Sequence, residues 1–362
     1  MKAWTAGRWL KLATLSALAW AAVAGACLLI GSTGVGWPTA VQLGPRLEVV
    51  LLGSLVGAAL AAAGVTYQCV LRNPLADPYL LGVASGATLG TLLWRWPGLA
   101  DEGVVLLAGQ PAMALAGALL MSALVLAVSS RTRGGRLDPV TVVLVGVVVS
   151  SLCSAVVLLL LSLRPELLAG GGGLAGVLVG ALQTNLTPGQ AVVSAAIVVA
   201  GWAGLVLLTP AMAVSMLGDS EALSLGLHLT RLRYLALALA AVVVAAAVAV
   251  SGPIGFVGLI CPHIGRLLVG ADPRRLLPVA TAAGACLLTA ADALCRGLSM
   301  PHLLGTLLPV GVVTALLGGP FFLYLLARPG GVPGFPADGL SVARTREALP
   351  AADSPARGGG RT

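Results

Sequence analysis

The sequence predicts an all-α integral membrane protein with about ten transmembrane helices. Hydrophobic residues make up 58% of the 362 residues. Charged residues make up only 9%, whereas a typical soluble domain carries about 25%. The apolar residues occur in long runs, and a helix of about 20 apolar residues crosses about 30 Å of hydrocarbon. These runs are too long for the short alternating strands of a transmembrane barrel.

Ten apolar segments can be drawn along the chain. The first has an apolar part, 12–30, that is longer than the usual signal-peptide core of about 7–15 residues, which favours a retained helix over a cleaved signal. The eighth segment is short and is drawn partly from the charge distribution and the family resemblance described below. The segments are 10–31, 47–69, 79–95, 104–128, 140–162, 189–209, 233–251, 256–270, 277–297 and 306–327.

The basic residues divide unevenly between the two sides of such a drawing. All but four of the 21 Lys and Arg residues fall on the side of the N-terminus, the exceptions being Arg46, Arg95, Arg164 and Arg296. The positive-inside rule therefore predicts that both termini are cytoplasmic. We expect a cytoplasmic N-terminal tail (1–9), a single transmembrane domain (10–327) and a cytoplasmic tail (328–362). The last tail lacks apolar periodicity and is expected to be disordered.

Two connections between segments have interpretable patterns. In the loop 70–78, Asn73-Pro74 and Asp77-Pro78 each place a capping side chain before a proline at a first helical position. The loop is either a well-capped turn or part of the cytoplasmic mouth of a transport path, and both interpretations stay open. The apolar piece 174–182 is too short to span, so it lies at the outer surface or folds partway in.

The stretch 251–278 is apolar but interrupted. Proline removes a helix hydrogen bond and glycine lowers helix stability, so a straight helix is not expected there. Broken helices at membrane depth are tolerated where they line a cavity, which makes this stretch a candidate joint or lining of a path. His263 is expected to have a packed, structural role. The helix-break and gating candidates are Asn73, Pro74, Gly252, Pro253, Gly255, Gly258, Pro262 and His263.

Four strings resemble a known family in the order in which the family has them. They are YQCVLRNPLADPYLLGVASGA (67–87), LGDSEALSLGL (217–227), GPIGFVGLICPHIGRLLVG (252–270) and LPVGVVTALLGGPFFLYLL (308–326). Together they span most of residues 45–327. The chain resembles the FecCD-type permeases, the transmembrane subunits of ATP-binding-cassette importers for ferric siderophores, haem or cobalamin.

The resemblance implies the type II importer permease fold and a set of partners. These are a second permease copy (a homodimer, or a heterodimer with a close paralogue), two cytoplasmic ATPase subunits and an extracytoplasmic solute-binding protein. The location implied is the inner (cytoplasmic) membrane. The chain itself would perform alternating access and no covalent chemistry. The resemblance does not distinguish among the three cargo classes.

Residues 211–232 are the expected contact with the ATPase. The piece 219–225 is too short to span and carries helix signals, with Asp219 or Ser220 as the cap and Gly226 past the end. Ala222 and Leu223 would offer a small apolar surface, and a second short helix would begin near Thr230 with Arg231 and Arg233 at the membrane face. The resemblance assigns ATPase coupling to this segment. The candidate residues are Gly218, Asp219, Glu221, Ala222 and Gly226.

Two outer arginines are candidates for docking the binding protein. Family members usually carry Arg-Leu-Pro-Arg before the second span, and here the sequence Gln42 to Arg46 keeps only the second arginine. Arg296, at the outer end of the ninth span, matches another family position. Arg296 also follows Asp292 by four residues, so the simpler expectation for Asp292 is an ion pair along one helix face.

Several functions are not supported by the residues present. Lysine occurs only at positions 2 and 11, neither of which fits a phosphate-binding loop, so ATP hydrolysis would need a separate subunit. No catalytic pair, metal-ligand spacing or cofactor motif is recognisable, and the six cysteines are expected to be buried thiols. The scattered basic residues suggest topology determinants and not nucleic-acid binding. The main alternative is a secondary transporter driven by an ion gradient, and a membrane enzyme is a third class.

Overall fold

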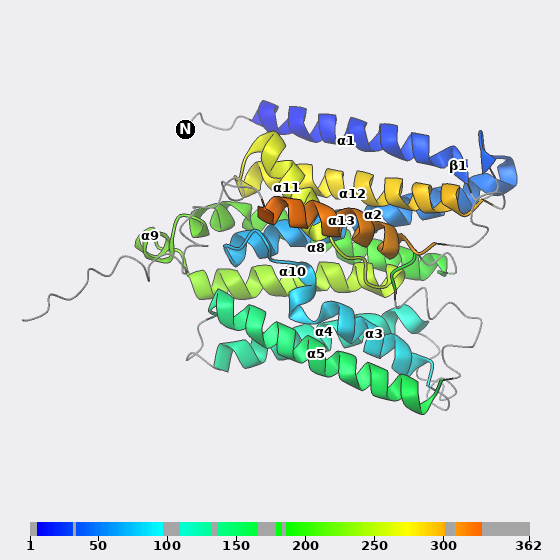
Figure 1. Ribbon diagram of the computed structural model, residues 1–362. Helices are drawn as coiled ribbons and strands as arrows, with labels where there is room; N and C mark the ends of the chain where they lie inside the picture. The colour runs from blue at the N-terminus through cyan, green and yellow to red at the C-terminus, as the bar shows by residue number, and fades with distance from the viewer. Residues whose placement is uncertain are drawn as a thin grey trace, which may run out of the picture.

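The protein is an elongated bundle of helices (Figure 1). The computed structural model describes residues 6–31, 34–96, 109–131, 137–165, 179–182, 186–300 and 308–327. The predicted tail from residue 328 lies outside these residues, as does most of the tail 1–9. The helices are α1 (Ala6–Leu28), α2 (Ala40–Val70), α3 (Val83–Trp94), α4 (Gly109–Arg131), α5 (Pro139–Leu163), α8 (Pro188–Ser215), α9 (Asp219–Ser224), α10 (Leu229–Ser251), α11 (Val257–Val269), α12 (Pro273–Leu298) and α13 (Val310–Ala327), with a 3-10 turn η1 (Pro78–Leu81) before α3.

Each of the ten predicted segments contains a helix, which confirms the all-α transmembrane fold. Within the described ranges, seven helices are long and apolar enough to cross a membrane. The helices α3, α11 and α13 are shorter. Helix α2 begins at Ala40, about two turns before the predicted start at 47, because Thr39 and Gln42 cap it: the Thr39 N–H donates to Gln42 Oε1 at 3.3 Å.

Several helices begin where a capping residue precedes a proline. Asp138 accepts a hydrogen bond from the Thr141 N–H at 3.1 Å, and Pro139 follows it at the start of α5. Asp272 accepts from the Arg274 N–H at 3.0 Å ahead of Pro273 and α12. Thr187 and Gln190 cap α8 in the same manner, with Pro188 between them. The proline lacks the N–H that a first helical residue would leave unsatisfied, and the cap satisfies the next ones.

Helix α2 is the centre of the bundle. Its residues from Val49 to Val70 are almost all buried, and α8, α10, α11 and α12 pack around it. Glycines allow backbone contact at two places, Gly57 with Gly284 of α12 and Gly64 with Gly258 of α11. Small residues at helix interfaces are typical of membrane bundles, where close packing replaces the hydrophobic effect as the source of association.

The end of the bundle opposite α9 is closed by short irregular pieces. Strands β1 (Ile30–Gly31) and β2 (Gly34–Val35) form an antiparallel hairpin after α1. Gly180 lies in the left-handed region (φ 85°), where an added Cβ would contact the Pro253 carbonyl, and its own carbonyl accepts from the Gly311 N–H at 2.9 Å. The described part of the piece 174–182 therefore packs onto the connection between α10 and α11, in agreement with partial insertion.

The close approach of α2 and α12 gives a first prediction. In Gly57→Ala the added methyl group would overlap the Gly284 carbonyl, so we expect a loss of about 1–3 kcal/mol in stability from overpacking. Thermal unfolding of the purified protein in detergent measures this. Gly25→Ala on α1 is the matched control, since nothing lies within 4 Å of its added methyl group. Equal unfolding midpoints for the two variants would contradict the proposed role of the contact.

Candidate functional site

The short helix α9 projects from one end of the bundle, at the same end as the start of α1 (Figure 1). Gly218 turns the chain into it with φ 149° and ψ 159°, and the helix runs from Asp219 to Ser224. Its end is a Schellman motif: the Leu227 N–H bonds to the Ala222 carbonyl at 3.0 Å and the Gly226 N–H to the Leu223 carbonyl at 2.9 Å. Gly226 has φ 79°, a conformation that favours glycine.

The predicted helix is therefore present, with corrections at its ends. It stops at Ser224, one residue early, because Leu225 is the C-cap. The N-cap is Gly218 and neither Asp219 nor Ser220, which leaves the Asp219 carboxylate available for other partners.

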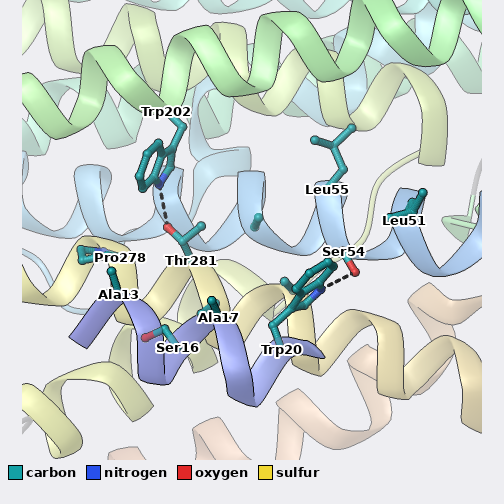
Figure 2. A pocket seen from close by; sticks show the side chains of 13 residues that line it. Ala13, Ser16, Ala17, Trp20, Leu51, Ser54, Leu55, Trp202, Pro278 and Thr281 are labelled. Carbon is teal, nitrogen blue, oxygen red and sulfur yellow. Dashed lines mark hydrogen bonds between the residues drawn. The ribbon is translucent and has the colours of Figure 1, made fainter. Parts of the chain in front are cut away.

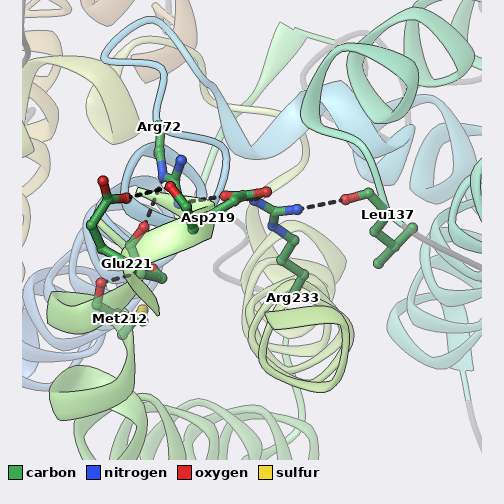
Figure 3. Close-up of polar contacts among 8 residues, drawn as sticks. Arg72, Leu137, Met212, Asp219, Glu221 and Arg233 are labelled. Atoms are coloured by element: carbon green, nitrogen blue, oxygen red, sulfur yellow. Dashed lines mark hydrogen bonds and ion pairs between the residues drawn. The ribbon is translucent and has the colours of Figure 1, made fainter. Parts of the chain in front are cut away.

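Asp219 pairs with arginines from two other parts of the chain (Figure 3). Its carboxylate pairs with Arg72, in the loop after α2, at 2.5 Å and with Arg233 of α10 at 2.9 Å. Arg72 Nε also donates to the Ser215 carbonyl at 2.7 Å, and Arg233 Nη1 donates to the Leu137 carbonyl at 3.0 Å. These contacts hold α9 to the ends of α2, α8 and α10 and to the residue preceding the cap of α5.

The apolar face of α9 differs from the predicted one. Ala222 is fully buried against the bundle, so it is unavailable to a partner. The exposed apolar side chains are Leu217, Leu223 and Leu225, each about two-thirds exposed (64%, 60% and 65%). We call these three residues the α9 leucine patch. Exposed leucines at the tip of the bundle are candidates for contact with another protein.

The two acidic residues of α9 both lie near Arg72 (Figure 3). Glu221 is exposed beside the α9 leucine patch. Its pKa is lowered because its own backbone N–H and the Ser220 hydroxyl donate hydrogen bonds to the carboxylate, so it is charged at neutral pH. Arg72 also lowers the pKa of Glu221 electrostatically, and Asp219 pairs with both Arg72 and Arg233. The Glu221 carboxylate lies beside Gly218, so its negative charge is held at the N-terminal end of α9.

The second short helix expected near Thr230 does not exist as a separate element. Helix α10 begins at Leu229 and continues without interruption to Ser251. Arg233 is 9% exposed and points at Asp219 and Leu137, and only Arg231 is exposed as expected. Arg233 was expected at the membrane face because the sequence alone does not show that the Asp219 carboxylate, on α9, pairs with it.

The predicted break lies between α10 and α11. Gly252 (φ 66°) ends α10, and Phe256 (φ 68°) precedes α11 in a left-handed conformation that is uncommon for a non-glycine residue. The Tyr79 hydroxyl accepts from the Ile254 N–H at 2.8 Å and donates to the Ile254 carbonyl at 3.0 Å. Ile254 lies between two helices, so its backbone N–H and C=O have no partner within a helix. The Tyr79 hydroxyl provides a hydrogen bond to both.

Pro262 does not break the chain, contrary to its place among the break candidates. It lies inside α11, which continues to Val269. Proline cannot donate to the carbonyl four residues earlier, which here belongs to Gly258. Gln68 of α2 takes over, with its Nε2 donating to the Gly258 carbonyl at 3.2 Å. The Gln68 Oε1 atom in turn accepts a hydrogen bond from Arg266, which is also buried.

The remaining break candidates divide into packed and open positions. A methyl group on Gly258 would lie 2.8 Å from Pro78 Cδ, whereas nothing lies within 4 Å of one on Gly255. Gly258 is therefore closely packed, whereas Gly255 has open space around it. Pro253 contacts Gly180 through its carbonyl. His263 is buried and packs edge-on against Phe321 of α13, with ring centroids 5.7 Å apart.

The loop after α2 has the predicted caps. The Asn73 carboxamide accepts from the Leu75 N–H at 2.9 Å ahead of a single turn that includes Pro74, and Asp77 accepts from the Tyr79 N–H at 2.8 Å. Asp77 starts η1 and not a continuous span, because Gly82 (φ 72°) separates η1 from α3. The same stretch of chain contains Arg72, which pairs with Asp219 of α9, and Tyr79, which bonds to Ile254 between α10 and α11. It therefore contacts both α9 and the break between α10 and α11.

Both docking candidates contact the chain's own backbone. Arg46 is 9% exposed and its Nη1 donates to the carbonyls of Leu28 (3.0 Å) and Gly36 (3.2 Å). Arg296 Nη1 donates to the Ile30 carbonyl at 2.9 Å, and its Nε pairs with Asp292 at 2.8 Å, which confirms the i,i+4 pair. The arginines therefore brace the hairpin between α1 and α2. Docking of a binding protein stays a prediction.

Three residues that join these segments were not singled out from the sequence. Arg72, Gln68 and Tyr79 form hydrogen bonds with groups that are distant along the chain: Ser215, Gly258 and Ile254, each at least 143 residues away. The only sequence signal was their occurrence in the string 67–87. Among the described residues there is no cluster of three or more His, Cys, Asp or Glu side chains that could hold a metal ion.

Comparison with known proteins identifies the family of this chain. The sequence pattern of the FecCD transport family matches residues 36–328. The cobalamin import system permease protein BtuC of Halobacterium salinarum is 39% identical over 282 residues, covering 78% of this chain and 72% of that protein. The hemin transport system permease protein HmuU of Yersinia pestis is 38% identical over 288 residues, covering 80% of this chain and 83% of that protein.

Solved structures give the same answer for the fold. An inward-facing ABC transporter assigned to the metal-chelate type is 30% identical, with a TM-score of 0.75, and the alignment covers 87% of this chain and 98% of that chain. PsaBC from Streptococcus pneumoniae has a TM-score of 0.52 at 16% identity, over 77% of this chain and 90% of that chain, and supports the fold alone.

The contact of Gln68 with Gly258 gives a second prediction. Gln68→Leu would leave a buried carbonyl and the Arg266 guanidinium short of a partner, at an expected cost of about 1–3 kcal/mol. Pro262→Ala restores the N–H that can bond to the Gly258 carbonyl within α11. In the double variant we therefore expect part of the lost stability to return, as measured by thermal unfolding in detergent. Additive losses in the double variant would contradict this account of Gln68.

Proposed function

We propose, from the premise that this chain belongs to the FecCD transport family, that it moves an iron chelate (siderophore), haem or cobalamin across the cytoplasmic membrane. The chain is a permease subunit of an ATP-binding-cassette importer. The cargo class follows from the names of the relatives, which transport cobalamin and hemin. Transport would proceed by alternating access, in which the path opens first to one side and then to the other.

We propose that ATP hydrolysis drives this movement through the α9 tip. Its leucine patch is exposed, and Asp219 ties the helix to the loop after α2 and to α10. A partner that binds the leucine patch and shifts α9 would therefore move several helix ends together. We assign this partner as the ATPase, with Gly218 and Gly226 shaping the helix, Asp219 anchoring it and Glu221 on the contact face. Ala222 packs beneath it.

The proposed assembly contains four chains besides this one. It consists of two permease copies, or this chain and a close paralogue, with two cytoplasmic ATPase subunits and an extracytoplasmic binding protein. ATP hydrolysis belongs to the ATPase subunits, because neither lysine of this chain lies in a phosphate-binding loop. We place both termini in the cytoplasm, on the side of α9, from the distribution of basic residues.

Uptake by proteoliposomes tests the function and its coupling. Accumulation of cargo should require the ATPase subunit and internal ATP, and uptake driven by an ion gradient alone would instead support a secondary transporter. In the double variant Leu223→Ser with Leu225→Ser, we expect the ATPase to be lost on copurification, because the apolar contact area is removed. ATP-driven uptake should fall at least tenfold, because a loss of about 1.4 kcal/mol in binding free energy weakens the affinity for the ATPase tenfold.

The control for this experiment is Leu43→Ser, an exposed leucine (46%) at the opposite end of the bundle. It should leave ATPase copurification unchanged. If the double variant copurifies with its ATPase and transports normally, α9 is not the coupling element.

Docking of the binding protein at Arg46 and Arg296 is tested by charge reversal in both partners. Arg46→Glu and Arg296→Glu should weaken association, but each also disrupts a contact to the chain's own carbonyls. Restored association with a binding protein whose facing glutamates are changed to arginine would identify docking, because a partner mutation cannot repair the hairpin. Weakened association without any restoration would assign the arginines to the hairpin alone.

A further inference from the structure

An exposed apolar patch lies at the end of the bundle opposite α9. It consists of Val35 of β2, Trp37, and Val41 in the first turn of α2, which are 73%, 89% and 85% exposed. We call these three residues the hairpin patch. The segment 31–45 contains it and carries no charged side chain, whereas a segment of this length with the composition of a soluble domain would carry about four. An exposed apolar surface of this kind marks a contact with a protein or with lipid.

The neighbouring helix α1 indicates the depth of this patch in the membrane. One face of α1 packs on the bundle, where Trp20 Nε1 donates to Ser54 of α2 at 2.8 Å (Figure 2). Lys11, Leu15 and Leu18 are exposed and share the opposite face, at helical spacings of four and three residues. This face of α1 therefore contacts lipid, and Lys11 marks the level at which it reaches the membrane surface.

The other end of α1 lies at the height of the hairpin patch. Leu28 follows Lys11 by 17 residues, which is about 26 Å along the helix. The hydrocarbon core is about 30 Å thick, so the end of α1 lies close to its far boundary. Arg46 Nη1 donates to the carbonyls of both Leu28 and Gly36, which holds the hairpin at this height. Trp37, the next residue, therefore lies where the hydrocarbon meets the lipid headgroups.

We propose that the hairpin patch is a membrane anchor, which inserts Trp37 into the lipid interface at the end of the bundle opposite α9. Tryptophan is enriched at this depth because its ring is apolar and its N–H can still reach polar partners. The uncharged segment 31–45 enters the interface without desolvating a charge, and it offers a protein partner no ion pair. Arg46 and Arg296 brace the same hairpin, so the anchor holds the ends of α1, α2 and α12 at one height in the membrane.

Quenching of tryptophan emission by brominated lipids tests the anchor. The purified full-length permease is reconstituted into bilayers whose acyl chains carry bromine either near the headgroup or near the chain end. Comparison with Trp37→Phe isolates the emission of Trp37 among the seven tryptophans. Bromine near the headgroup should quench this emission more strongly than bromine near the chain end. The reverse order would overturn the proposal, and so would quenching by aqueous iodide with none by either lipid, which would assign the patch to a protein partner.

A second measurement tests whether Trp37 itself holds the hairpin in the interface. A nitroxide on Val41→Cys reports contact with oxygen, which concentrates in lipid, and with a water-soluble nickel chelate, since the chain's own six cysteines are buried or partly buried. Trp37→Ala should shift this label toward the nickel chelate, and Trp37→Tyr should restore the original ratio, because both aromatic side chains favour the interface.

The control for this measurement is Tyr324→Ala, which removes an exposed aromatic side chain of α13 and should leave the label unchanged. An unchanged ratio in Trp37→Ala would overturn the anchoring role. Neither measurement requires an ATPase or cargo, so the outcome is independent of the proposed transport function.

Discussion

Close backbone packing around α2 is the constraint on which the rest of the bundle depends. Within a bilayer, lipid chains compete equally with apolar side chains, so helices are held by close contact and not by the exclusion of water. Gly57 meets Gly284 of α12, and Gly64 meets Gly258 of α11. The second contact fixes the height of α11 against α2, which brings the Gly258 carbonyl to Gln68. The first is reinforced by the Ser54 and Thr289 hydroxyls at 3.0 Å.

The same constraint explains where the polar residues lie. A broken helix between packed neighbours leaves backbone groups that water cannot reach, so side chains must satisfy them. Tyr79 does so for Ile254, and Gln68 does so for the carbonyl released by Pro262. Both side chains belong to α2 or to the short turn that follows it. The loop that continues from α2 also carries Arg72 to Asp219, so α9, α2 and the break are joined through one stretch of chain.

The sequence was sufficient for features that depend on neighbouring residues and insufficient for those that depend on distant ones. The predicted spans other than the short α11 follow from apolar runs, the Asp292–Arg296 pair from helix spacing, and the end of α9 from Gly226. Ala222, expected at the surface, is buried because α9 lies against the bundle, and Arg46 turns inward to carbonyls of the hairpin. Pro262 leaves α11 intact because Gln68, 194 positions earlier, donates to the carbonyl that the missing proline N–H would have bonded. No local sequence pattern predicts that contact.

The central claim is that α9, held to the bundle by Asp219, is the element on which the ATPase acts. Cross-linking from α9 tests it most directly. Ser224 is exposed on α9, whereas the chain's own six cysteines are buried or partly buried, so Ser224→Cys would introduce the accessible thiol. In a complex that hydrolyses ATP and transports cargo, a short thiol-specific cross-linker should join this position to the ATPase subunit. The absence of that adduct in a transporting complex would contradict the account.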